Sequence, residues 1–219
     1  MTAALVIAVR GGLLAKSRCA SVLSALDRQA LVTAMLDDML SAATAVADIV
    51  DITVVTPTPA LADLAVSRGA FAIREAQPLG VNAAFARGGA AARARVSGGS
   101  LLILPGDLPL IRPRDLEGLI VATRSGAVAL APSRLDGGTG AIGLPAGVDL
   151  PFLFGPDSYR RHWMAVRSLG HTLQVIDPGP LGLDIDHPRD LAQIAYARHS
   201  RSAAVLRSIL AAYPYKEIA

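Results

Sequence analysis

The sequence predicts an α/β fold in three layers, with a mostly parallel sheet between two layers of helices. Apolar runs alternate with segments of helical periodicity along most of the chain, and this order of strand and helix requires βαβ crossovers. The runs are continuous rather than alternating, as expected for strands that are covered on both faces. Of the 219 residues, 52% are hydrophobic and 18% are charged, so the chain can bury a large core.

Each element in the regular part of the chain has its own signal. The first apolar run ends at a Gly-Gly pair, and Ser24 then stands three residues before Asp27, as at many helix N-termini. Apolar residues at helical spacing follow, which predicts a long amphipathic helix. The next run is β-branched and is ended by prolines, which indicates a strand. The expected strands are residues 3–9, 50–56, 70–73, 100–104 and 127–131, and the other helices are 60–67, one from about Val81, and 113–124.

The pattern loosens after Ser133, where Gly and Pro recur. We expect strands at 141–144 and 172–176 and helices at 158–169 and 188–198. No change of composition divides the chain, so residues 1–200 are expected to form a single domain. The rest, 201–219, is expected to be an extra helix or a tail.

Charge and cysteine content exclude several classes of protein. Cys19 is the only cysteine, which rules out an internal disulfide and a cysteine-based zinc site. The net charge of +3 is spread along the chain without a basic stripe, so we expect no nucleic-acid partner. No apolar stretch approaches 18 residues and the N-terminus lacks the basic start of a signal peptide, so we expect no membrane association and a cytoplasmic location.

The loop after the first strand has the composition of a phosphate-binding loop. In an open parallel sheet, ligands bind outside the carboxyl ends of the strands. Glycines let backbone N–H groups approach a phosphate, and lysine or arginine then offsets its charge. The loop matches neither the dinucleotide-binding nor the Walker A pattern, and a turn with solvated cations is the alternative. Its candidate residues are Arg10, Gly11, Gly12, Lys16 and Arg18.

Three aspartates follow later strands and are candidates for Mg²⁺. Asp107 stands between two prolines after a buried strand, where a lone carboxylate needs a partner. Asp184 and Asp186 are spaced by two, which places both side chains on one side of an extended segment. The alternatives are a hydrogen-bonding role for Asp107 and a helix cap formed by Asp186.

Two glycine turns carry hydroxyl groups that could hold a carboxylate or a phosphate. Thr139 follows one turn, and Ser158 follows the other, which contains Gly155, at an expected helix N-terminus. The histidines have no metal-ligand spacing, and His162 is expected to be structural or solvated unless it lies in this site. Neither a Ser-His-Asp order nor a pair of glutamates indicates a hydrolase.

Taken together, these segments resemble the guanylyltransferases of coenzyme F420 biosynthesis, from about residue 4 to 195. The Phe-Gly-Pro-x-Ser element together with the Gly-Gly-Thr turn is fairly specific, whereas the other motifs are widespread among nucleotidyltransferases. The segments that carry the resemblance are 15–18, 54–57, 79–84, 106–110, 131–134, 137–139, 154–158 with 161–162, and 183–191.

The resemblance implies a nucleotidyltransferase fold and a reaction. GMP would pass from GTP to the phosphate of 2-phospho-L-lactate, phosphoenolpyruvate or 3-phospho-D-glycerate, with release of pyrophosphate, and a later transferase of the pathway would take the product. Sequence alone does not select the acid. Alternatives are a transferase that uses CTP or another nucleotide on a sugar phosphate or cofactor, a nucleotide-sugar glycosyltransferase, and a nucleotide-binding protein without turnover. The Ala-rich surfaces and residues 205–211 would suit a homodimer.

The resemblance also implies a role for each candidate residue. Mg²⁺ would be held by Asp107, Asp184 and Asp186, and the acid by Thr139, Gly155 and Ser158. Lys16 and Arg18 would offset charge on the departing pyrophosphate, and the nucleotide would be bound by Arg10, Gly11, Gly12, Lys16, Gly80 and Asn82.

The sequence departs from the family pattern in two places. Arg10 and Gly11 stand where lysine and proline are usual, which keeps a cation and a turn. Gly140 replaces an asparagine that is often found after the Gly-Gly-Thr turn. We expect this replacement to remove a side-chain donor beside the acid.

Overall fold

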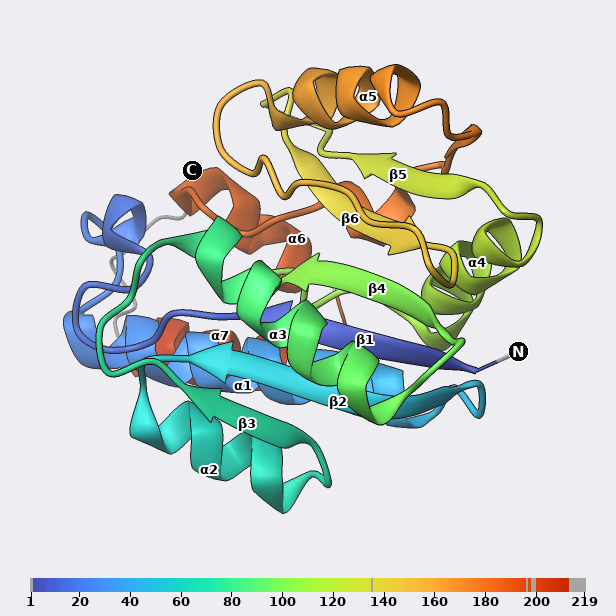
Figure 1. The fold of residues 1–219 in the computed structure, drawn as a ribbon. Helices are drawn as coiled ribbons and strands as arrows, with labels where there is room; N and C mark the ends of the chain where they lie inside the picture. The colour runs from blue at the N-terminus through green and yellow to red at the C-terminus, as the bar shows by residue number, and fades with distance from the viewer. Residues whose placement is uncertain (1, 135, 196, 198–199, 213–219) are drawn as a thin grey trace.

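A computed structural model shows one seven-stranded sheet with helices on both faces (Figure 1). It describes residues 2–134, 136–195, 197 and 200–212. The sheet order is β3-β2-β1-β4-β6-β5-β7. The strands are β1 (Ala3–Ala8), β2 (Ile49–Thr56), β3 (Phe71–Arg74), β4 (Ser100–Pro105), β5 (Val128–Pro132), β6 (Thr139–Leu144) and β7 (Leu173–Val175). The helices are α1 (Ala25–Thr44), α2 (Pro59–Ser67), α3 (Val81–Arg95), α4 (Pro113–Arg124), α5 (Ser158–Ser168), α6 (Leu191–Ala195) and α7 (Arg201–Ala212).

The sheet is mostly parallel, as the sequence predicted, with β6 as the exception. β1 lies in the middle and pairs in parallel with β2 and β4. β6 runs antiparallel to both β4 and β5, and β5 then pairs in parallel with β7. Because β6 is reversed, its first residue lies at the edge of the sheet where β4 ends. The loop after β4 and the start of β6 therefore meet at one edge.

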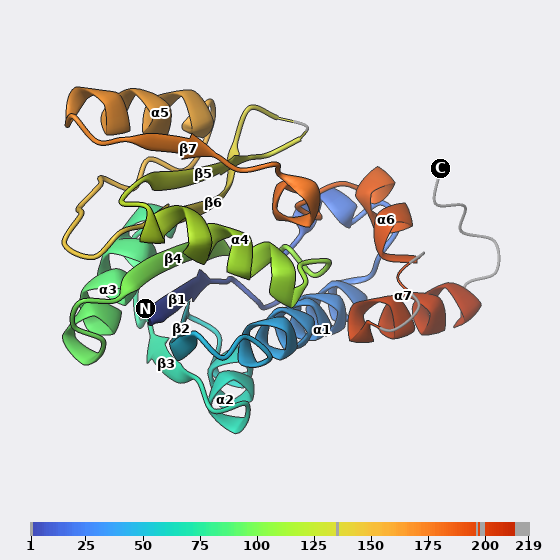
Figure 2. The same cartoon turned by 90° about the vertical axis from the view of Figure 1, so that its right-hand side faces the viewer.

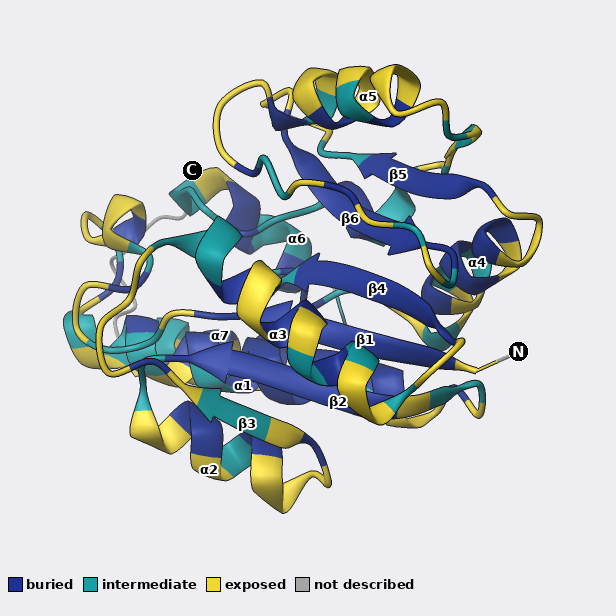
Figure 3. Cartoon of the chain, viewed as in Figure 1, coloured by how far each residue is buried: buried dark blue, intermediate teal, exposed yellow. Residues whose placement is uncertain are grey.

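The continuous apolar run of β1 contributes buried side chains to both faces of the sheet. Leu5 and Ile7 pack into the core cluster that contains α1, α2, α4 and α7, whereas Val6 packs into the cluster that contains α3 and α5. All three side chains are fully buried. Figure 2 shows α1 and α3 on opposite sides of the sheet, and Figure 3 shows β1 buried along its length and β4 buried except at its end. No helix in the described parts of the chain is long and apolar enough to cross a membrane.

The expected start of the first helix is confirmed in atomic detail. The Ser24 hydroxyl accepts a hydrogen bond from the Asp27 N–H, and the Asp27 carboxylate accepts one from the Ser24 N–H. Further along α1, the Asp38 carboxylate accepts hydrogen bonds from the backbone N–H groups of Arg201 and Ser202 at 2.7 and 2.9 Å. This carboxylate fixes the start of α7 against α1. Residues 213–219, the rest of the expected helix or tail, lie outside the described residues.

The helix expected over 188–198 is shorter in the structure. It begins as a 3₁₀ turn, Pro188–Asp190, and the α-helix covers only Leu191–Ala195. The reason is local: the Asp190 carboxylate draws the chain before it into a tight turn, and the Ala197 N–H bonds to the Ile194 carbonyl, three residues back. Residues 196 and 198 of the expected helix lie outside the described residues.

Candidate active site

A cavity of about 390 Å³ opens at the carboxyl ends of the central strands. Its lining comes from the loop after β1, the residues after β3 and β4, the start of α3, and Asp186. Parallel sheets bind ligands at this edge. Of the residues that the sequence singled out, the cavity brings together Arg10, Lys16, Arg18, Gly80, Asp107 and Asp186.

Lys16 lies between two of the predicted metal ligands. Its ammonium Nζ is 2.7 Å from Asp107 Oδ2 and 2.7 Å from Asp186 Oδ1. Burial alone would lower the pKa of Lys16, but the two carboxylates outweigh it and raise that pKa above its usual range. The backbone of Lys16 is left-handed, with φ at 49°, which is uncommon for a residue with a side chain. The loop is therefore shaped to aim this ammonium group at both carboxylates.

Arg18 forms a second ion pair with Asp186. Its Nη1 lies 2.8 Å from Asp186 Oδ2, and its side chain is 62% exposed, against 11% for Lys16. Burial opposes ionisation of Asp186, but the charges of Lys16, Arg18 and His187 outweigh it and lower its pKa. Asp186 is therefore a firmly ionised carboxylate at the mouth of the cavity.

The position of Asp107 depends on the glycine before it. A Cβ on Gly106 would lie 2.4 Å from Val9 Cβ, so only glycine allows the β4 loop to pass this close to β1. The Asp107 carbonyl accepts a hydrogen bond from the Ile185 N–H at 3.1 Å, which brings the segment of the other two aspartates alongside. Asp107 Oδ1 is buried and has no hydrogen-bond partner among the described residues. This oxygen is an unpaired acceptor on a residue that lines the cavity.

Asp184 has a raised pKa. Burial, and then the negative charge of Asp107, raise the pKa of Asp184 to about 6. The Ser133 hydroxyl donates to Asp184 Oδ1 at 3.2 Å. A cation placed here would offset this crowding of negative charge. Within the described residues, however, no group of three or more His, Cys, Asp or Glu side chains is assembled to hold a metal ion.

The hydrogen bonds that hold the turn before α6 come from Asp190, and not from Asp186, which the sequence offered as a possible helix cap. Its Oδ2 accepts hydrogen bonds from the N–H groups of Asp186 at 3.0 Å and His187 at 2.7 Å. The interpretation of Asp186 as the helix cap is wrong, because the N-cap residue is His187, and Asp190 completes the capping box three residues later. The carboxylate of Asp186 is thereby left to face the cavity.

His162 fixes the orientation of Thr139 in the predicted acid site. The Leu153 N–H donates to His162 Nε2 at 2.8 Å, so this nitrogen carries no proton. The proton of the neutral ring is then on Nδ1, which donates to Thr139 Oγ1 at 2.8 Å. Burial and the nearby charge of Arg161 lower the pKa of His162 to about 4, which keeps the ring neutral near pH 7. The hydroxyl proton of Thr139 is therefore free to be donated to a ligand.

The turn before α5 brings the other two acid-site candidates close to Thr139. Gly155 has a φ of 122°, which suits glycine, and its carbonyl accepts a hydrogen bond from the Ser158 N–H at 3.1 Å. The Tyr159 N–H bonds to the Gly137 carbonyl at 3.1 Å, joining this turn to the Gly-Gly-Thr turn. Ser158 is buried at the start of α5, where anions are favoured. The predicted corner of Thr139, Gly155 and Ser158 is thus assembled.

Asn82 has a structural partner that the sequence did not reveal. Its side-chain oxygen accepts from the Phe154 N–H at 2.8 Å, and its side-chain nitrogen donates to the Phe154 carbonyl at 3.2 Å. The Phe154 ring packs on His162 and on Phe85 of α3, with centroids 5.0 and 4.6 Å apart. Asn82 therefore ties the start of α3 to the turn before α5. Its predicted contact with the nucleotide stays a prediction.

The expectation for Gly140 is corrected by the structure. A Cβ at this position would lie 1.8 Å from the Leu181 carbonyl oxygen. The side-chain direction at Gly140 thus meets the backbone of the neighbouring segment and does not face the acid corner. The glycine is required for packing, so it takes no donor away from the site.

Comparison with known proteins gives the family. A family model described as "Guanylyl transferase CofC like" matches residues 3–216. The chain belongs to this guanylyltransferase family. The 3-phospho-D-glycerate guanylyltransferase of Phenylobacterium zucineum is 43% identical over 207 residues, or 94% of this chain and 95% of that protein. The phosphoenolpyruvate guanylyltransferase of Nocardia farcinica is 38% identical over 199 residues, or 89% and 86%.

Solved structures show that this guanylyltransferase has a nucleotidyltransferase fold. A Desulfovibrio desulfuricans protein described as a nucleotide-diphospho-sugar transferase superposes with a TM-score of 0.78 at 16% identity, over 97% of this chain and 99% of that chain. A CMP:2-keto-3-deoxy-manno-octonic acid synthetase complexed with CTP superposes with a TM-score of 0.57 at 15% identity, over 89% and 97%. The predicted fold class is confirmed.

Proposed function

We propose that this guanylyltransferase moves GMP from GTP to the phosphate of 3-phospho-D-glycerate or phosphoenolpyruvate and releases pyrophosphate. Its relatives carry the names of these two reactions, and the product suits a later transferase in coenzyme F420 biosynthesis. The observation that carries the proposal is the arrangement of Lys16, Asp107 and Asp186 in a cavity beside the Thr139 corner, at one sheet edge.

The reaction needs two anions to meet, and Lys16 and Arg18 offer positive charge in the cavity proposed to bind them. A phosphate oxygen of the acid attacks the α-phosphorus of GTP, the new P–O bond forms, and the bond to the β-phosphate breaks. No covalent intermediate on the protein is required, so the rate enhancement comes from positioning and charge neutralisation. We assign to Lys16 and Arg18 the neutralisation of the leaving pyrophosphate.

The three aspartates offer the oxygen ligands that Mg²⁺ prefers, although the described residues do not assemble them as a ready-made metal site. Asp107 Oδ1 is a buried oxygen without a partner among the described residues, and Asp184 is a carboxyl group whose ionisation a nearby cation would favour. Asp186 is ionised and borders the same cavity. When bound, Mg²⁺ offsets the charge of the phosphates around the bond that breaks.

The acid is proposed to lie in the corner of Thr139, Gly155 and Ser158. Thr139 donates its hydroxyl proton, because His162 already donates to its oxygen. The start of α5 adds backbone N–H groups and a favourable dipole for an anion. These donors suit the carboxylate or phosphate of a three-carbon acid.

The proposed reaction is tested by following pyrophosphate release. The purified protein with Mg²⁺ is incubated with each of the four nucleoside triphosphates and with each of 3-phospho-D-glycerate, phosphoenolpyruvate and 2-phospho-L-lactate. Release that requires GTP and one of these acids is expected. Release with CTP but not with GTP would overturn the proposal. Size-exclusion chromatography in the same preparation tests the predicted homodimer.

A further inference from the structure

Glu75 is a buried carboxylate that the proposed mechanism does not use. It directly follows β3 and lines the same cavity as Lys16 and Asp107. Its side chain is only 3% exposed, and its Oε1 has no hydrogen-bond partner within the part of the chain that the structure describes. A buried carboxylate oxygen without a hydrogen bond costs free energy. An oxygen of this kind beside a cavity indicates a ligand that donates to it.

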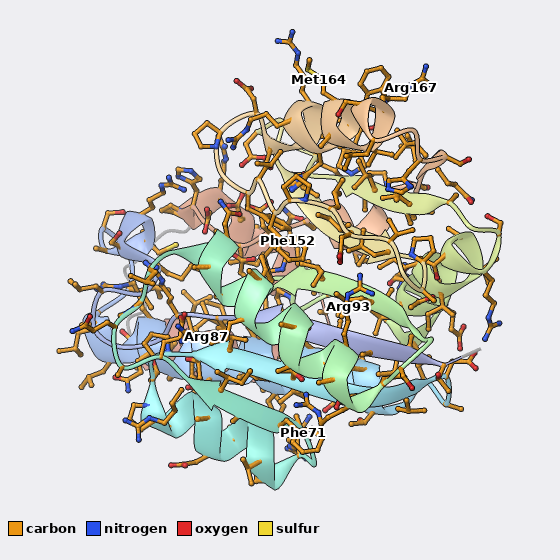
Figure 4. All side chains as sticks on the ribbon, in the orientation of Figure 1. Phe71, Arg87, Arg93, Phe152, Met164 and Arg167 are labelled. Atoms are coloured by element: carbon orange, nitrogen blue, oxygen red, sulfur yellow. The ribbon has the colours of Figure 1, made fainter. Side chains whose placement is uncertain are left out.

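The surroundings hold Glu75 in place but leave Oε1 free to accept. The Glu75 N–H bonds to the Thr56 carbonyl at 3.1 Å, which fixes the backbone at the carboxyl end of β2. Arg87 of α3, labelled in Figure 4, has its Nη1 3.8 Å from Oε1. This distance is too long for a hydrogen bond, so Arg87 offsets the charge without occupying the oxygen.

The place of Glu75 along the sheet edge matches the base of a nucleotide rather than its phosphates. In the sheet order, Glu75 follows β3, Lys16 lies after β1, and Asp107 follows β4. Two strand spacings, about 10 Å, therefore separate the carboxylate from the phosphate loop. A phosphate would be repelled by a carboxylate. A base joined through a ribose to phosphates at Lys16 would extend toward Glu75.

The cavity wall near Glu75 is apolar, as the faces of a base require. Val55 of β2 and Val81 and Ala84 of α3 line the cavity together with Glu75. Apolar side chains around a single buried acceptor are typical of sites that bind a flat ring and read one of its edges.

We propose that Glu75 selects guanine by accepting hydrogen bonds from its N1–H and its N2 amino group. This inference rests on the proposed use of GTP. Guanine is the one common base that presents two N–H donors side by side on this edge. Adenine offers a lone pair at N1, so it would leave the carboxylate unpaired and repelled. A site that loses a hydrogen-bond partner in this way rejects the wrong ligand strongly.

The decisive variant is Glu75→Gln, with Glu117→Gln as the matched control. Glu117 lies exposed on α4, outside the cavity. The glutamine of Glu75→Gln keeps one acceptor but turns an NH₂ group toward the guanine amino group. We expect binding of GTP, measured by calorimetry without the acid, to weaken on the order of 100-fold. Xanthosine triphosphate, whose oxygen replaces the amino group, is expected to bind the variant more tightly than it binds the wild type.

The outcomes separate this inference from the proposed function. A Glu75→Gln variant that still prefers GTP to ATP and xanthosine triphosphate as the wild type does would overturn the role of Glu75. Equal weakening for every nucleotide, with no gain for xanthosine triphosphate, would also overturn it, because it would place the carboxylate on the ribose. A wild-type protein that binds GTP through Glu75 but transfers nothing to any acid would contradict the proposed function and support the inference.

Discussion

The ammonium group of Lys16 lies 2.7 Å from Asp107 Oδ2, although 91 residues separate the two in the sequence. Lys16 comes from the loop after β1, and Asp107 comes from the loop after β4, the strand beside β1. The same ammonium group is 2.7 Å from Asp186 Oδ1, a contact across 170 residues. One lysine therefore joins three separate parts of the chain at the proposed reaction centre.

Replacement of this lysine should affect both turnover and stability. In Lys16→Met the charge on the leaving pyrophosphate loses its partner, so kcat should fall by about three orders of magnitude. The free energy of unfolding should also fall, by about 1–3 kcal/mol, because two partly buried carboxylates lose their cation. Arg18→Met is the comparison: Arg18 is 62% exposed, so its loss should leave the unfolding free energy nearly unchanged. Steady-state kinetics and urea unfolding measure these effects, and equal losses of stability in both variants would contradict the account.

Asp107→Asn should abolish turnover without unfolding the protein. The amide has nearly the shape of the carboxylate, but it lacks the charge that the proposed Mg²⁺ needs. We expect a loss of several kcal/mol of transition-state stabilisation, or about three decades or more in rate. Pyrophosphate release and circular dichroism are the measurements. Turnover close to that of the wild type would remove the metal role assigned to Asp107.

Asp184 should make the metal-free protein less stable as the pH rises. Its pKa is raised to about 6 from an unfolded value of 3.8, so between these values the folded state binds more protons than the unfolded state. The contribution of Asp184 to the free energy of unfolding is therefore largest below pH 3.8 and is lost as the pH rises through 6. In EDTA, Asp184→Asn should be more stable than the wild type at pH 7, and the difference should vanish near pH 4. A difference that grows toward low pH would show that folding does not raise the pKa of Asp184.

Thr139→Val should weaken binding of the acid while binding of GTP stays unchanged. The valine keeps the shape of the side chain but cannot donate to the acid, and it leaves His162 Nδ1 without an acceptor. We expect KM for the acid to rise about 10-fold or more, with KM for GTP within error of the wild type. Thr139→Ser keeps the hydroxyl and should retain most of the affinity. An unchanged KM for the acid in Thr139→Val would show that the acid does not bind at Thr139.

Gly140→Asn should destabilise the fold rather than restore a contact with the acid. A Cβ here would come within 1.8 Å of the Leu181 carbonyl oxygen, which forces the backbone of β6 or of its neighbour to move. The free energy of unfolding should fall by more than about 3 kcal/mol, as overpacking in a tight site does. Thermal unfolding tests this, and a variant as stable as the wild type with tighter acid binding would support the earlier interpretation instead.

The sequence predicted the local and repetitive features of this protein well. The continuous run of β1 and the reciprocal bonds of Ser24 and Asp27 depend on neighbours along the chain, so their pattern is visible in the sequence. The loops that carry Lys16, Asp107 and Asp186 were also predicted, because a parallel sheet collects the loops after its strands at one edge. The reversed β6 was not indicated, since its apolar residues resemble those of a parallel strand.

Features that depend on contacts between distant segments could not be predicted. The position of Lys16 between two carboxylates, the proton of His162 on the Thr139 side, and the buried oxygen of Glu75 each require knowledge of what lies across the fold. The helix start at His187 did have a local signal: Pro188 follows it directly, and Asp190 stands three residues after it, as in a capping box.

Identifying the product by ³¹P nuclear magnetic resonance shows directly whether this protein joins GMP to a three-carbon acid. The wild-type protein is incubated with GTP, Mg²⁺ and 3-phospho-D-glycerate or phosphoenolpyruvate. We expect the paired, mutually coupled signals of a diphosphate that joins GMP to the acid, together with pyrophosphate, and we expect neither with Asp107→Asn. Formation of GMP and pyrophosphate alone, or no change in GTP with either acid, would contradict it.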